Sequence, residues 1–121
     1  MQKNNKRIMR INDEIARETA NIIRFELSDP RLGGIVSVLH ADTTVDLKTC
    51  KISVSILGDE TQQEGAMAAL KSASGFIRKR IAEKMNLRHT PELTFLADDS
   101  IAHAMRMQQL IAEANRPDNA T

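Results

Sequence analysis

The chain has 121 residues, is 41% hydrophobic and carries a formal net charge of +1, which suffices for one modest core and leaves too little for two domains. No apolar run approaches the roughly 18 residues of a membrane span, and the basic N-terminus lacks the apolar region of a secretory signal, so we expect a cytoplasmic protein without membrane contact. The lone cysteine, Cys50, cannot form an internal disulfide. Three scattered histidines without ligand spacing predict no metal site, and we expect no cofactor.

A long helix is predicted over residues 8–27, because isoleucines recur there at helical spacing and Pro30 is expected to stop the helix. The other side of this helix carries Arg10, Arg17 and Arg24 seven residues apart, which places them in one stripe. We therefore expect one apolar face and one cationic face.

Two strands should follow this helix. The segment IVSVLHAD at 35–42 is rich in β-branched residues, and TCKISVSIL at 49–57 alternates apolar and polar residues. The alternation predicts one buried face, with Cys50 as an inert core residue. The intervening DTTVDLK favours a hairpin connection.

A helix, a break and a second helix are predicted after Gly58. Thr61 and Glu64 have the spacing of a capping box, so the first of these helices should begin near Thr61. Gly75 interrupts the apolar pattern, and glycine inside a helix costs about 1 kcal/mol relative to alanine. We assign this glycine mainly to architecture, because a break lets two apolar stripes reach one sheet. The functional part is the free N-terminus that a break would give the second helix, which suits phosphate. The stripes are Met67, Leu70 and Ala73, then Ile77, Ile81 and Met85.

The remainder of the chain predicts a strand and a last helix. Asn86 and the HTP turn should end the second middle helix, ELTFL at 92–96 reads as a short strand, and DDS at 98–100 should start a helix that runs past Ile111. The order α, β, β, α, α, β, α predicts an α+β fold in which helices cover a three-stranded sheet.

Catalytic and base-stacking groups are scarce. Asp98 and Asp99 are interpreted as helix capping, and the chain has no Walker loop, no GxGxxG and no paired-histidine motif, so we expect no enzyme. There is no tryptophan or tyrosine, and we expect the three phenylalanines to serve the core, which leaves no aromatic stacking platform. The phenylalanines are Phe25, Phe76 and Phe95.

The cations are segregated along the chain, although the net charge is small. Residues 1–12 hold no acid, and the basic residues of 71–88 face only Glu83 in their own segment. Such segregation can create a local field that a phosphate backbone senses. The structural alternative is that these side chains are ordinary solvated surface or lie over a polar face. The basic residues of 71–88 are Lys71, Arg78, Lys79, Arg80, Lys84 and Arg88.

Five segments resemble the ribosome-binding factor A family, bacterial small-subunit assembly factors with a type II KH-like domain. They are KNNKRIMRINDEIARETANII, SDPRLGGIVSV, CKISVSILGD, KSASGFIRKRIAEKMNLRHTPELTF and DDSI, and together they cover nearly the whole chain. In that family an alanine-any-glycine kink replaces the GxxG loop that clamps nucleic-acid backbone in KH domains. Ala73, Ser74 and Gly75 supply this kink here. The resemblance implies a single KH-like domain over residues 1–115 and a short flexible tail at 116–121.

The resemblance also implies a function. It implies a noncatalytic factor that binds the immature 30S subunit through 16S rRNA and supports late maturation, 16S 5′-end processing and growth in the cold. Assembly GTPases would be linked to its release, and we expect a monomer. The alternatives are a protein-interaction adaptor without RNA contact and, third, a hydrolase. The candidate RNA-binding residues are Arg78, Lys79, Arg80 and Lys84, then Lys71, Arg7, Arg10 and Arg17, with Ser74 and Gly75 as contacts at the kink.

Overall fold

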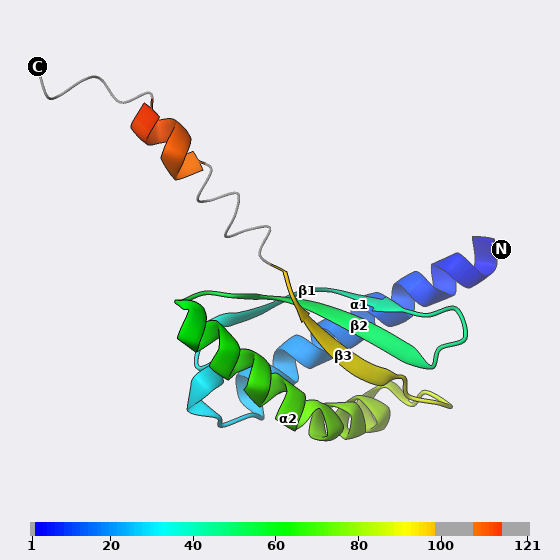
Figure 1. The fold of residues 1–121 in the computed structure, drawn as a ribbon. Helices are drawn as coiled ribbons and strands as arrows, with labels where there is room; N and C mark the ends of the chain where they lie inside the picture. The colour runs from blue at the N-terminus through cyan, green and yellow to red at the C-terminus, as the bar shows by residue number, and fades with distance from the viewer. Residues whose placement is uncertain (1, 99–107, 115–121) are drawn as a thin grey trace, which may run out of the picture.

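The computed structural model describes residues 2–98 and 108–114, and two long helices with a three-stranded sheet dominate it (Figure 1). This composition confirms the predicted α+β class. Residues 108–114 are helical. In chain order the elements are helix α1 (Gln2–Phe25), the 3-10 turn η1 (Pro30–Leu32), strands β1 (Val36–Thr43) and β2 (Thr49–Ile56), helix α2 (Glu60–Met85) and strand β3 (Glu92–Ala97).

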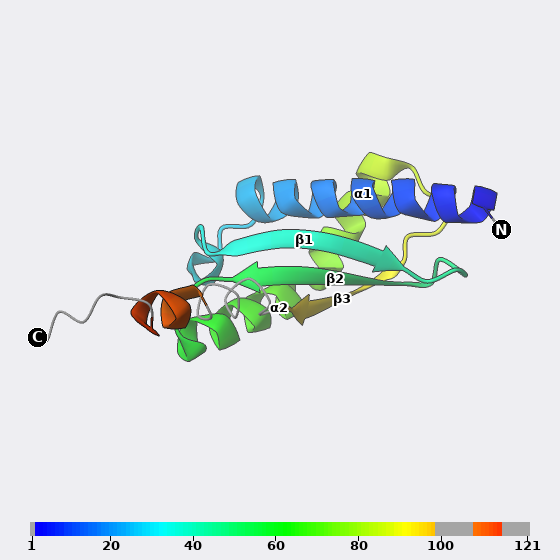
Figure 2. The ribbon, with the colours of Figure 1, turned by 90° about the horizontal axis from the view of Figure 1, so that it is seen from above.

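The sheet has the strand order β1-β2-β3, so both outer strands have an unpaired edge within the part of the chain described (Figure 2). β1 and β2 form the predicted antiparallel hairpin, whereas β3 pairs with β2 in parallel. A parallel pair needs a long crossover, and α2 supplies it. α1 packs against β1 and α2 against β3, and the two helices also contact each other. In Figure 2 the last turns of α2 lie beside α1.

One hydrophobic core joins the sheet to both helices. In β2 the residues Cys50, Ile52, Val54 and Ile56 are buried, as the alternation predicted. Burial raises the pKa of the Cys50 thiol, which suits an inert core residue. Fully burying a side chain such as Ile52 contributes about 1.5–3 kcal/mol. The helices contribute Ile11, Ile15, Ile22, Ile23, Ala66, Ala69, Leu70, Ile77 and Ile81 to the same core.

Helix α2 is continuous, so the predicted break at Gly75 is wrong. Its buried residues Ala66, Leu70, Ile77 and Ile81 form one stripe that runs past the glycine. The roughly 1 kcal/mol cost of a helical glycine is smaller than the gain from burying this stripe on both sides of it. In Figure 1 the last turns of α2 run in a different direction from the first turns. Gly75 therefore lies in a curved helix and creates no new helix N-terminus.

The N-cap of α2 is Asp59, two residues before the predicted cap at Thr61. The Asp59 carboxylate accepts a hydrogen bond of 2.8 Å from the Gln62 backbone N–H, and the Gln62 side chain accepts one of 2.8 Å from the Asp59 N–H. This reciprocal pair is a capping box, so the assignment to Thr61 and Glu64 is wrong. Gly58 explains the shift, because its φ of 132° turns the chain directly before Asp59. The predicted end at Asn86 is confirmed, in the left-handed conformation.

Two of the three phenylalanines lie outside the core, contrary to the prediction. Phe25 is 72% exposed at the end of α1, where the Arg24 guanidinium lies 5.2 Å from its ring centroid. Phe76 is 44% exposed because the next residue, Ile77, faces the core and consecutive helical residues point about 100° apart. Only the prediction for Phe95 is confirmed, since its partly buried side chain packs against the core.

Helix α1 ends before Leu27, the last residue predicted for it. α1 ends at Phe25, before Pro30, and the proline opens η1 instead, with the Asp29 side chain capping that turn. The predicted helix start at DDS and its continuation through Ile101 and Met105 lie outside the described residues. Among the residues that are described, no helix combines the length and apolar character needed to cross a membrane.

Candidate nucleic-acid interface

The cations of α2 project from two sides of the helix. Lys71, Ser74 and Arg78 are spaced three and four residues apart and share the side next to β3. Arg80 and Lys84 are four residues apart and share the side next to α1. The basic triplet at 78–80 is therefore divided, because consecutive residues of a helix cannot point the same way.

On the side next to α1, the cations are neutralised by carboxylates. The Arg80 Nε donates to Glu26 Oε1 over 2.6 Å, and its Nη1 reaches Glu83 Oε2 at 2.5 Å. Lys84 Nζ lies 2.9 Å from Glu26 Oε2 and 3.5 Å from Glu18 Oε2. Hydrogen bonds from Lys84 and then Arg80 lower the pKa of Glu26, and the same bonds raise the pKa of both cations. These two candidates connect α2 to α1.

On the side next to β3, the cations border a groove. This groove between α2 and β3 has a volume of about 550 Å³. The Arg78 guanidinium donates to the Thr90 carbonyl oxygen through Nε at 3.2 Å and Nη2 at 2.8 Å, which positions it beside the start of β3. A carbonyl carries no formal charge, so Arg78 keeps its full positive charge there. The groove is lined by Met67, Ala68, Lys71, Ser74, Glu92, Leu93, Thr94 and Phe95, with Glu92 as the one carboxylate in this set.

The strip of α2 between these two sides bears Gly75 and Lys79, both exposed. A Cβ atom added to Gly75 would have no heavy atom within 4 Å, and Gly75 is not among the residues with positive φ. Neither steric room nor a left-handed backbone requires a glycine at this position, and its assignment to architecture stays a prediction. Lys79 and Lys71 form no salt bridge with any residue that the structure describes.

The three arginines predicted on α1 are not brought to this groove. Arg7, Arg10 and Arg17 are exposed on α1, which lies alongside β1 at the far side of the sheet from β3 (Figure 2). The predicted set thus falls into three groups: the residues at or next to the groove, the pair bound to Glu26, and the arginines of α1. Within the described ranges 2–98 and 108–114, no group of three or more histidine, cysteine or acidic residues could hold a metal ion.

The family model of ribosome-binding factor A matches residues 7–111. The chain belongs to the ribosome-binding factor A family. A ribosome-binding factor A from Lachnospira eligens is 45% identical over 98% of this chain and 92% of that protein. Another from Clostridium botulinum is 48% identical over 84% of this chain and 89% of its own length.

Solved structures of ribosome-binding factor A share the fold. The crystal structure of the Thermus thermophilus protein is 27% identical, with a TM-score of 0.66 over 74% of this chain and 94% of that chain. A Thermus thermophilus homology model, fitted into an electron cryo-microscopy map of a 30S–ribosome-binding factor A complex, is 25% identical with a TM-score of 0.61, over 73% of this chain and 91% of its own. The predicted membership and KH-like α+β fold are confirmed, with one curved α2 in place of two separate helices.

Proposed function

We propose that this protein is a noncatalytic assembly factor that binds the immature 30S subunit through 16S rRNA. The observation that carries the proposal is the groove between α2 and β3, which has Lys71 in its lining and Arg78 beside the start of β3. Neither cation has a carboxylate partner among the described residues. The names of the relatives and the complex of the Thermus thermophilus protein support the same partner. Phosphate groups are the anions that such a cationic groove would meet on the subunit.

In this proposal the RNA backbone lies along the groove. Lys71 and Arg78 contact phosphates, and the Ser74 hydroxyl, which donates to the Lys71 carbonyl at 2.8 Å, keeps acceptor capacity toward the RNA. Gly75 lets the backbone approach α2 closely, because no side chain stands on the helix at that position. Lys79 adds a third cation next to this approach.

Binding of this kind acts by shifting populations. A factor that binds one rRNA conformation more tightly than another raises the share of the first, and release follows when mature contacts compete better. We propose that this supports late maturation, 16S 5′-end processing and growth in the cold, with assembly GTPases linked to release. We further propose that residues 1–115 act as one domain, as a cytoplasmic monomer without a cofactor.

The test replaces Lys71 by glutamate and measures the affinity for 30S precursors over a range of salt concentrations. The matched control is Lys51→Glu, the same charge change at an exposed residue of β2 that alternates away from the helices. We expect Lys71→Glu to weaken binding about tenfold and to reduce the slope of log K against log salt by about 0.7, the value per phosphate contact on single strands. Lys51→Glu should change neither.

Equal affinity and equal slope for the two variants would show that the groove does not hold RNA. Nuclease digestion of the bound subunit separates the adaptor alternative, because a complex that survives loss of the rRNA is held by protein contacts. The proposal therefore requires both the charge dependence and the RNA dependence.

A further inference from the structure

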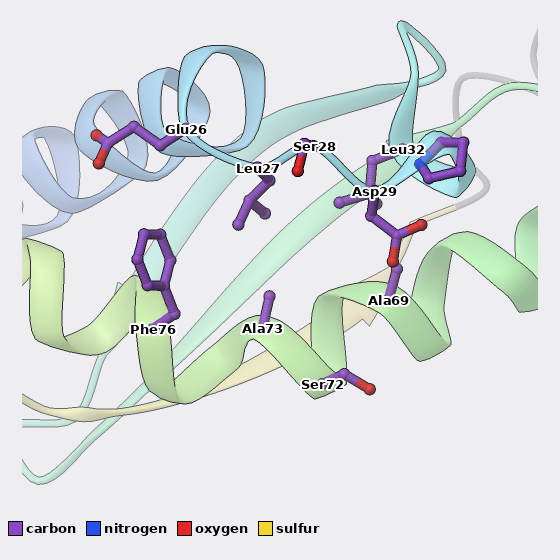
Figure 3. A pocket seen from close by; sticks show the side chains of 10 residues that line it. Glu26, Leu27, Ser28, Asp29, Leu32, Ala69, Ser72, Ala73 and Phe76 are labelled. Atoms are coloured by element: carbon purple, nitrogen blue, oxygen red, sulfur yellow. The ribbon is translucent and has the colours of Figure 1, made fainter.

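A second hollow lies on the opposite side of α2, between that helix and the connection from α1 to η1. Its volume is about 540 Å³, within the range of about 300–1,000 Å³ typical of ligand pockets. Figure 3 shows that the side chains of Phe76 and Leu27 project into it from its two walls, above a floor that includes Ala73. The hollow is thus lined by an aromatic ring, an aliphatic side chain and small residues.

Phe76 has the exposure that a stacking side chain needs. The residue is 44% exposed, and the core stripe of α2 is complete without it, because Ile77 and Leu70 fill that stripe. Stacking of a base on an aromatic ring requires an accessible π-face, and the exposed part of Phe76 supplies one. Leu27 supplies the apolar wall opposite the ring.

The polar groups at the edge of the hollow are mostly acceptors. The Asp29 carboxylate is held by Arg31, whose Nη2 donates to Asp29 Oδ2 at 2.7 Å, and these bonds lower the pKa of Asp29 to about 2. Arg31 donates twice to each oxygen of this carboxylate, so its lone pairs are occupied. The acceptor that remains is the Ser28 hydroxyl, which points toward the hollow in Figure 3. Such an acceptor matches the exocyclic amino group of a nucleobase.

The hollow and the groove border the same stretch of α2, since Ser72 and Ala73 line the hollow and Lys71 and Ser74 line the groove. Residues 72–75 are Ser, Ala, Ser and Gly, so no large side chain stands on this stretch. An RNA strand held at Lys71 and Arg78 can therefore cross α2 at Gly75 and place a base on the other side. We propose that the hollow holds one unpaired nucleobase stacked on Phe76 while the RNA backbone lies in the groove beside β3. This inference rests on the proposed RNA binding and adds a base site to it.

The experiment compares two RNA oligomers of equal length, an oligoadenylate and an abasic oligomer with the same phosphates. Phe76→Leu keeps the apolar volume and removes the π-face, whereas Ala73→Leu fills the hollow from its floor and leaves Phe76 in place. Phe25→Leu is the matched control, because Phe25 is an exposed phenylalanine that does not line the hollow. Circular dichroism checks that each variant is folded.

We expect Phe76→Leu and Ala73→Leu to weaken oligoadenylate binding about fivefold or more, since base–aromatic stacking contributes at least this much. The salt slope should stay unchanged because no charge is altered, binding of the abasic oligomer should be unaffected, and Phe25→Leu should behave as wild type. Lys71→Glu, in contrast, should weaken binding of both oligomers.

Three results would overturn the inference. If Phe76→Leu binds both oligomers like wild type while Lys71→Glu weakens both, RNA binding stands and the base site is wrong. If Phe76→Leu weakens binding only to 30S subunits, a protein of the subunit occupies the hollow instead. If wild type binds neither oligomer nor rRNA on the subunit, the proposed function fails and the base site fails with it.

Discussion

The two sides of α2 carry the same kinds of cation, and the structure gives them different surroundings. Beside α1, Arg80 and Lys84 contact the carboxylates of Glu26, Glu18 and Glu83. Beside β3, Arg78 contacts only a backbone carbonyl among the described residues, and Lys71 borders an open groove. A cation with a carboxylate partner has much of its field cancelled, so it is a weaker site for phosphate than one without.

The difference teaches that a basic run in a sequence is not one functional unit. The carboxylate that neutralises Arg80 and Lys84 lies 54 and 58 residues away in the chain, so no local reading of the basic segment could reveal it. Helical phase then decides which cation meets that carboxylate.

Ile77→Ala should destabilise the protein by about 2–5 kcal/mol, because it opens a cavity in the core stripe shared by both halves of α2. Chemical denaturation followed by circular dichroism measures this loss. A single cooperative transition with the lower midpoint is expected, since the helix is continuous through Gly75. If the segment after Gly75 unfolded separately in the wild-type protein, the two sides of α2 would belong to independent units.

Gly75→Ala should stabilise the protein by about 0.5–1 kcal/mol, because alanine favours a helix and its Cβ would lie in open space. Thermal unfolding measures the gain. A companion variant, Gly75→Gln, should fold equally well and bind 30S precursors less tightly, since its side chain would obstruct the approach of RNA. Loss of stability in Gly75→Ala would instead return the glycine to an architectural role.

Glu26→Gln should give the smallest effect, and that effect should depend on pH. The pKa of Glu26 is lower in the folded protein than its ordinary value of 4.5, so its contribution to stability is present above that pH and is lost as the pH falls through the folded-state pKa. Wild type should therefore be more stable than the variant near neutral pH, and the difference should disappear in acid. A difference of the same size at every pH would show that the ion pairs with Lys84 and Arg80 do not cause it.

Local sequence patterns predicted the sheet well and the site poorly. Alternation in 49–57 identified the buried face of β2, and β-branched residues identified β1, because a strand's two faces are read directly from a period of two. The continuity of α2 was missed because the cost of Gly75 is local, while the burial of Ile77 and Ile81 depends on a sheet formed elsewhere. Residue spacing alone cannot compare the cost of a helical glycine with the free energy gained by burying these isoleucines.

Phe76 could have been recognised as an outward residue from the sequence. Once Ile77 and Ile81 are assigned to the core, helical geometry turns Phe76 about 100° away from it. The hollow beside Phe76 could not have been predicted in the same way, because its other wall comes from Leu27 and Pro30 in a distant segment. The Arg78 contact with the Thr90 carbonyl likewise depends on the return of the chain into β3.

The most direct test of the separation between the two sides uses one matched pair of variants, Lys71→Gln and Lys84→Gln. Each removes one positive charge from α2, the first beside the groove and the second beside Glu26. The measurement is the slope of log K against log salt for binding to 30S precursors. Lys71→Gln should reduce the slope by about 0.7, whereas Lys84→Gln should leave it unchanged and lower the thermal stability. A reduced slope for Lys84→Gln together with a wild-type slope for Lys71→Gln would contradict the assignment of the groove.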